Sequence, residues 1–156
     1  MSNEVYGFAR LPSPPDDAAR ICRDLESGTG LGVYQIPVNE LYGFTEVPGP
    51  DDACFVFSVS DRPGNKNATY LVDYLDYADG AHIGMPLKGK ERVRLLVRFV
   101  DLLFSEWRAC SVSLAVTDSS QIEETKAVTP DDLFRTLVTD LEECAPPDVL
   151  YQIEGA

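Results

Sequence analysis

Apolar residues recur at helical spacing in one long segment of the chain. Between Lys90 and Arg108 they fall three or four positions apart, and polar residues trace the opposite stripe. Three further apolar residues, Leu95, Phe99 and Leu102, widen the apolar side. The pattern predicts an amphipathic helix over 90–108 that lies across a sheet. Its apolar positions are Val93, Leu96, Val97, Val100, Leu103, Phe104 and Trp107.

Alternation of apolar and polar positions predicts strands in other segments. In 53–60, Phe55 and Phe57 point one way and Val56 the other. In 110–117 the alternation is strict, which is typical of an antiparallel or edge strand with one core face and one polar face. The segment 121–128 is a candidate to pair with 110–117. Further strands are expected at 4–9, 31–36 and 149–153.

Capping residues indicate two more helices. Ser13 is the expected cap of the first, with Pro14 at its first position, Asp16 at the positive end of its dipole and Gly28 as its stop. The run Thr129–Asp132 opens the second, which ends at two prolines. The glycines of 28–32 follow a helix and precede a strand, so they indicate a helix end and a turn rather than a nucleotide-binding loop.

Two connecting stretches are less regular. The residues 37–52 are rich in proline and glycine, which predicts a loop with a short extended piece near 41–44. A turn is expected at 61–67. The following 69–77 fits either a strand paired with 53–60 or a helix, and the β-branched and aromatic residues favour the strand.

Strands in consecutive pairs between helices are typical of an α+β fold. We therefore expect a single globular domain over 1–156, with a mostly antiparallel sheet and about three helices packed on it. No apolar run approaches the length needed to cross a bilayer, and the start of the chain lacks the features of a secretory signal. These features predict a cytoplasmic protein.

The net charge of the chain limits the kinds of partner that it can bind. The chain has 26 acidic and 13 basic residues, a formal charge of −13. The segment 88–108 contains six basic and three acidic residues and is therefore +3, so the rest of the chain sums to −16. Such a protein should be repelled by nucleic acid and by anionic membranes. The excess charge either keeps the protein soluble or steers a basic partner onto it.

Residues with catalytic or metal-binding chemistry are sparse. His82 is the single histidine, so any Ser-His or Cys-His system would have to use it, and a turn histidine between glycines is the simpler interpretation. The four cysteines lack close spacing and are interpreted as small buried thiols: Cys22, Cys54, Cys110 and Cys144. We predict no enzyme, no catalytic residue, no metal site and no cofactor.

Carboxylates and tyrosines interleave in the segment before His82. Three aspartates and His82 recur every third residue, a spacing that on a helix would offer ligands to a divalent ion. A protein-binding face is the better-supported hypothesis, because tyrosine is enriched at interface hot spots and carboxylates suit a basic partner. The predicted partner-binding residues are Tyr70, Asp73, Tyr74, Asp76, Tyr77 and Asp79.

In size, acidity and this Tyr70–Asp79 segment, the whole chain resembles the bacterial immunity proteins of toxin–immunity systems. The resemblance implies a protein that binds one cognate toxin tightly and blocks its active site or its access to substrate. A basic nuclease toxin would be a natural partner, with carboxylates here in the place of phosphates. The alternative is a small-molecule-binding or regulatory domain with a pocket between the sheet and the long helix.

Overall fold

In the described part of the chain, six strands form one mixed sheet in the order β2-β3-β1-β4-β6-β5. The computed structural model describes residues 4–64, 89–117, 121–143 and 147–155. The strands are β1 (Glu4–Arg10), β2 (Gly32–Gln35), β3 (Cys54–Ser60), β4 (Ser111–Thr117), β5 (Glu124–Val128) and β6 (Val149–Glu154). The helices are α1 (Ala18–Thr29), α2 (Gly89–Ser105) and α3 (Leu133–Glu143), with short 3-10 turns η1 (Val38–Glu40) and η3 (Pro130–Asp132).

The first part of the sheet has the connectivity of a split β-α-β motif. Among the described elements the chain order is β1-α1-β2-β3-α2-β4, and the four strands lie in the order β2-β3-β1-β4 with every neighbouring pair antiparallel. A β5-α3-β6 unit then extends the sheet, with β6 antiparallel to β4 and parallel to β5. The α+β fold with a mostly antiparallel sheet and three helices is confirmed.

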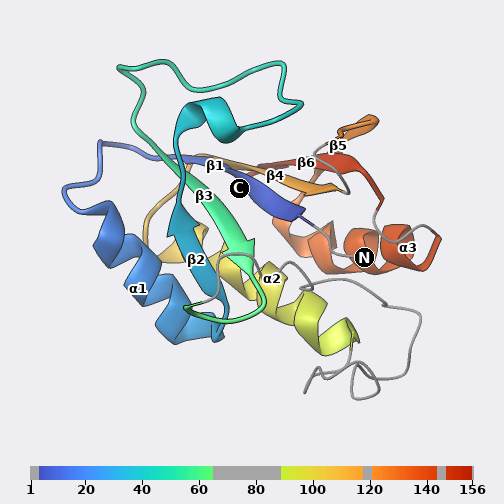
Figure 1. Cartoon of the computed structure of the whole chain (residues 1–156). Helices are drawn as coiled ribbons and strands as arrows, with labels where there is room; N and C mark the ends of the chain where they lie inside the picture. Colours follow the sequence, from blue (N-terminus) through green and yellow to red (C-terminus); the bar gives the residue numbers. More distant parts are fainter. Residues whose placement is uncertain (1–3, 65–88, 118–120, 144–146, 156) are drawn as a thin grey trace.

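The two faces of the sheet are covered differently. Figure 1 shows α1, α2 and α3 on one side of the sheet and the segment between β2 and β3, with η1, on the other. Because strand residues alternate between faces, each strand contributes to two separate cores. The helix side holds the larger core, and the opposite side is only partly covered by the connection from β2 to β3.

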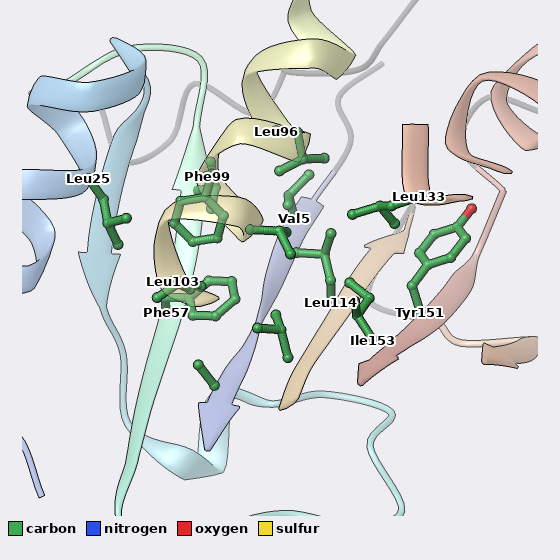
Figure 2. Packing of buried hydrophobic residues seen from close by; sticks show 14 of the residues in the cluster. Val5, Leu25, Phe57, Leu96, Phe99, Leu103, Leu114, Leu133, Tyr151 and Ile153 are labelled. Atoms are coloured by element: carbon green, nitrogen blue, oxygen red, sulfur yellow. The ribbon is translucent and has the colours of Figure 1, made fainter. Parts of the chain in front are cut away.

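The larger core packs α2 against the middle of the sheet. Leu96, Phe99 and Leu103 are fully buried, and the Phe99 ring meets the Phe57 ring edge-on at 4.9 Å between centroids. Figure 2 shows these side chains converging with Leu114 of β4. The helix expected at 90–108 is thus confirmed, and Phe99 lies at the centre of its buried side.

The smaller core lies on the opposite face and fastens the connection between β2 and β3. The Tyr6 hydroxyl donates a hydrogen bond to the Tyr42 carbonyl at 2.7 Å. The Phe44 ring lies 5.7 Å from the Tyr6 ring and 5.9 Å from the Phe8 ring, between centroids. These contacts hold 41–44 as a turn, so the extended piece expected there is wrong. The loop expected over 37–52 is otherwise confirmed, with η1 inside it.

The ends of α1 differ from the expected ones. The helix begins at Ala18, and the Asp17 carboxylate accepts a hydrogen bond from the Ala19 amide at 3.0 Å. A residue before proline is disfavoured in the helical region, so Pro15 delays the start beyond Ser13 and Pro14. Gly30, with a φ of 78°, ends the helix. Gly28 lies inside it instead, where a Cβ would come within 2.7 Å of Leu102 Cδ1.

Strand pairing confirms one expectation and departs from another. β4 is antiparallel to both of its neighbours, β1 and β6, which confirms the first of the two alternatives, an antiparallel or an edge strand; it is a central strand. Ala115 and Thr117, on its other face, are fully buried. The segment 121–128 forms β5, which pairs with β6 and not with β4. The β5-α3-β6 crossover places β6 between them, a long-range choice that alternation does not encode.

The remaining expected elements are confirmed with small shifts of their ends. β1, β2, β3 and β6 cover the strands expected at 4–9, 31–36, 53–60 and 149–153, and η3 with α3 follows Thr129. The long helix ends at Ser105 because Arg108 takes a left-handed φ of 57° and the Ala109 amide bonds back to the Leu103 carbonyl. The segment 69–77 and the second half of the turn 61–67 lie outside the described residues.

Candidate functional site

The residues that the sequence singles out for binding lie outside the described part of the chain. Tyr70, Asp73, Tyr74, Asp76, Tyr77, Asp79 and His82 all fall within 65–88. Their role as a partner-binding face stays a prediction. The candidate site must therefore be built from the described residues, and two neighbouring features on the face opposite the helices provide it.

The first feature is a cavity of about 320 Å³ on this face, which we call the sheet trough. Its floor and walls come from β1, β4, β5 and β6, and the connection from β2 to β3 closes one side. The residues that line it are Phe8, Arg10, Phe44, Thr45, Glu46, Ser111, Val112, Ser113, Thr125, Leu150, Gln152, Ile153 and Glu154.

Small residues on the central strand create the trough. Ser111 of β4 lies between Arg10 of β1 and Glu154 of β6 in the strand register. Ser113 lies in the same way between Phe8 and Gln152. Long side chains on both neighbours and short hydroxyls between them leave a hollow along β4. The alternation in 110–117 predicts this polar row, but it does not reveal which long side chains flank it.

Charges in the trough are unequal. The Arg10 guanidinium lies 3.5 Å from the Asp52 carboxylate and over the Phe8 ring at 5.3 Å from its centroid, so its charge is already partnered. In the described part of the chain, neither Glu46 nor Glu154 forms an ion pair. The trough therefore presents two unneutralised carboxylates beside hydroxyl and amide groups.

The second feature borders the trough and combines carboxylates with exposed apolar side chains. Tyr42 is 53% exposed, and Val38 and Val47 are also exposed. The connection 37–52 contains four acidic residues and no basic one. We call this the acidic loop surface and define it by Val38, Glu40, Tyr42, Glu46, Val47, Asp51 and Asp52.

A third group, on the helix side, has the residue types of an acid–base site but a closed environment. The Asp140 carboxylate accepts hydrogen bonds from the Lys126 ammonium and from the Tyr151 hydroxyl, each at 2.8 Å. Tyr151 is fully buried and Asp140 nearly so. Burial, then the hydrogen bond to Asp140, raises the pKa of Tyr151 well above its usual value. A substrate has no path to this hydroxyl, and the group ties α3 to β5 and β6.

The basic residues of α2 contact the structure around them rather than a separate patch. Arg92 is buried, 3.5 Å from the Asp61 carboxylate at the end of β3. The Arg98 side chain donates to the Gly28 carbonyl at 2.8 Å, and Arg94 lies 4.6 Å over the Phe134 ring. Each of these residues therefore contacts a different part of the fold. They pack α2 against α1, β3 and α3.

The thiols differ from the expectation of four buried cysteines. Cys22 and Cys54 are half-buried, and burial raises the pKa of both thiols. Cys110 is exposed, so its predicted burial is wrong: it precedes β4, at the surface beside the end of β6. Cys144 lies outside the described residues.

The described residues lack two further kinds of feature. They contain no group of three or more His, Cys, Asp or Glu side chains placed to hold a metal ion. None of their helices is long and apolar enough to cross a membrane. Described residues of α2 pack with the sheet in the larger core, and the trough lies on the opposite face. The ligand pocket between the sheet and the long helix, the alternative offered by the sequence, stays a prediction.

Comparisons with known proteins add no family to this description. No protein-family model, no curated protein and no solved structure matches the chain. The function must therefore be argued from the sheet trough and the acidic loop surface.

Proposed function

We propose that this chain is an immunity-type binding protein that neutralises a basic protein toxin in the cytoplasm. The observation that carries the proposal is the acidic loop surface, where exposed Tyr42, Val38 and Val47 stand among carboxylates without a basic residue in the same connection. Exposed apolar side chains rimmed by charge are typical of protein–protein interfaces.

The surface is held in shape before any partner arrives. The Tyr6 hydroxyl anchors the Tyr42 carbonyl, and Phe44 packs on the smaller core directly beside the exposed residues. The Gly49 amide donates to the Asp52 carboxylate at 2.7 Å, which closes the turn at the far end. A preorganised surface loses less conformational entropy on binding, so the same contacts yield a higher affinity.

Charge supports a basic partner. The formal charge of −13 attracts a cationic protein over a distance set by the ionic strength and raises the association rate. A toxin that acts on nucleic acid carries a cationic substrate-binding surface, and carboxylates that occupy this surface would exclude the substrate phosphates. Blocking of this kind needs no catalytic group on the inhibitor.

The test starts from the partner. The tagged chain is used to capture proteins from the lysate of its native host, and each captured protein is then expressed alone and together with the chain. We expect one basic protein that arrests growth alone and is tolerated with the chain. If every captured protein is harmless when expressed alone, the proposal of an immunity protein is wrong.

Variants locate the interface on the purified pair. Tyr42→Ala should weaken binding about 30-fold, the effect of losing a hot spot of ~2 kcal/mol, and Asp51→Lys should weaken it further at low salt. Glu106→Lys at the end of α2 is the matched control, because Glu106 is exposed on the helix side. Asp73→Lys with Asp76→Lys tests the sequence-predicted face in the same assay. Unchanged affinity for Tyr42→Ala and Asp51→Lys would remove the acidic loop surface from the interface.

A further inference from the structure

We propose that the sheet trough is the specificity pocket of this interface and takes an arginine side chain of the partner. This inference rests on the proposed function, since it supplies the occupant, but it can be tested without the partner. It assigns a binding role to β4 and β6 residues that the sequence did not single out: Ser111, Ser113, Gln152 and Glu154.

The size of the trough suits a side chain. Its volume of about 320 Å³ is at the lower end of the ~300–1,000 Å³ of small-molecule pockets. The floor is the row of serines on β4, so an extended side chain lying along that strand meets hydroxyl groups along its length.

The charge in the trough selects a cation. Arg10 is partnered by Asp52, which leaves Glu46 and Glu154 as the carboxylates without an ion pair in the described part of the trough. An anionic ligand would meet both of them and the overall charge of −13. A cationic ligand gains from both carboxylates, which are exposed, while the serines of the floor are half-buried.

The lining matches a guanidinium better than an ammonium. A guanidinium has five donors in one plane, so it can bond a carboxylate through two of them and a hydroxyl or amide oxygen through the others. Glu154 and Ser111 are register neighbours and offer such a set of acceptors. The Phe44 ring, half-buried at the wall, offers a flat surface on which the same plane can stack.

The trough is continuous with the acidic loop surface. Glu46 belongs to both, and Phe44 lies between the trough and the turn that presents Tyr42. A partner that covers Tyr42 therefore has the mouth of the trough within its footprint. An arginine inserted there would be surrounded by a contact rim, the arrangement in which arginine hot spots are found.

The experiment uses isotope-labelled protein and a capped arginine, N-acetyl-arginine methylamide, at low salt. Amide resonances of the trough strands should shift and saturate, with the largest changes at Ser111, Ser113 and Glu154. The neutral isostere, N-acetyl-citrulline methylamide, should bind at least about tenfold more weakly, because charge-assisted hydrogen bonds are lost. The affinity of the capped lysine should lie between the affinities of the arginine and citrulline probes.

Two variants test the assignment, each with a matched control. Glu154→Gln keeps the shape and should weaken binding of the arginine probe about tenfold, whereas Glu106→Gln should leave it unchanged. Ser113→Leu fills the floor and should abolish binding. Ser58 of β3 is also half-buried and lies on the same face of the sheet as Ser113, but outside the trough lining. Ser58→Leu should therefore leave binding of the arginine probe unchanged. Unchanged amide spectra away from the substitution show that each variant is folded.

The outcomes separate this inference from the proposed function. Arginine shifts confined to the trough and lost in Glu154→Gln support it. Equal binding of the citrulline probe, shifts at other sites only, or no shifts at saturating probe would overturn it, and the toxin test would stand unaffected. If the trough binds the arginine probe but Glu154→Gln leaves the affinity of the purified complex unchanged, the trough is a small-molecule site and the partner's arginine is excluded.

Discussion

Asp140 is the residue on which the α3 end of the fold depends. Its carboxylate receives the Lys126 ammonium from β5 and the Tyr151 hydroxyl from β6, so one side chain joins three elements. Figure 2 shows Tyr151 with its ring in the apolar core and its hydroxyl at the outer end. Buried polar groups are stable only when they are paired, which makes each member of this group sensitive to the loss of another.

Replacing Asp140 by alanine should destabilise the protein by about 3 kcal/mol, because it leaves the Tyr151 hydroxyl buried without an acceptor. Tyr151→Phe removes the donor as well as the need for an acceptor and should cost only about 1 kcal/mol. Urea unfolding followed by circular dichroism gives both values. Equal stability of Asp140→Ala and wild type would mean that the group contributes nothing.

The same group makes stability fall at alkaline pH. Burial and the bond to Asp140 raise the pKa of Tyr151, and the bond to Asp140 raises the pKa of Lys126. Above pH ~10 the unfolded chain releases the Tyr151 proton while the folded protein retains it, so the free energy of unfolding falls as pH rises. One such proton corresponds to about 1.4 kcal/mol per pH unit.

Unfolding measured from pH 8 upward should therefore show a decline that is shallower in Tyr151→Phe than in wild type. The stabilisation is fully present below pH ~10 and is lost above it, which is the sign expected for groups with raised pKa values in the fold. An equally steep decline in both proteins would contradict the assignment to Tyr151.

At the scale of elements, the two edges of the sheet are managed differently. At β2, the Glu26 carboxylate of α1 accepts a hydrogen bond from the Val33 amide at 3.0 Å, so a helix side chain satisfies a group on a strand that lies at the edge of the sheet as far as the described residues show it. At β5, a short and mostly exposed strand carries Lys126, a common device against edge-to-edge pairing. The β2 edge is thus protected by a hydrogen bond from another element, and the β5 edge is protected by the residues of the strand itself.

Glu26→Ala should open the β2 edge without unfolding the sheet. The Val33 amide would lose its acceptor, so its hydrogen exchange should accelerate at least about tenfold. The free energy of unfolding should fall by about 1 kcal/mol. Asp24→Ala is the control on the same helix, since Asp24 forms only an exposed ion pair with Arg20. Exchange at Val33 that is equally slow in both variants would contradict the capping role.

At the scale of the whole molecule, charged side chains lie mainly at the surface: among the described charged residues, only Arg92 and Asp140 are buried. Arg92, Arg94 and Arg98 contact neighbouring elements, and Arg94 and Arg98 remain exposed, so the positive segment 88–108 contributes both to the packing of α2 and to the charge of the surface. The acidic excess is left on the rest of the surface, including the acidic loop surface. Such an imbalance lowers stability through self-repulsion while it favours a cationic partner.

Added salt should therefore raise the melting temperature and weaken binding. From about 0.01 M to about 0.3 M NaCl the screening length falls below the spacing of surface charges, so the carboxylates repel one another less. Differential scanning calorimetry measures the first effect and titration of the purified complex the second. A melting temperature that falls with salt would show that ion pairs outweigh repulsion in this fold.

Sequence patterns located most elements because their cause is local. The spacing of Leu96, Phe99 and Leu103 predicts α2, and the alternation around Phe57 predicts β3, since each follows from the period of the element itself. Two sequence signals are misleading. Ser13 is an acceptable cap, but the prolines that follow it delay the helix, which begins at Ala18 with Asp17 as its cap. Alternation in 110–117 cannot tell an edge strand from a central one.

The candidate site was the least predictable part. The serines of β4 stand out in the sequence only as the polar half of an alternating strand. Arg10 lies about a hundred positions before them in the chain, and Glu154 lies about forty positions after them. Tyr42 was assigned to a loop without any sign that it is exposed. The tyrosines and aspartates of 70–79 remain a prediction of the sequence alone.

By itself the sequence determined the class of fold, the strong acidity and the position of the long helix, because composition and periodicity are properties of the chain before it folds. Only the tertiary structure decided that β6 separates β4 from β5, that Arg10 is paired by Asp52, and that a row of serines lies between longer side chains to form the trough. Those outcomes depend on strand order and register, which arise from the packing of residues far apart in the chain.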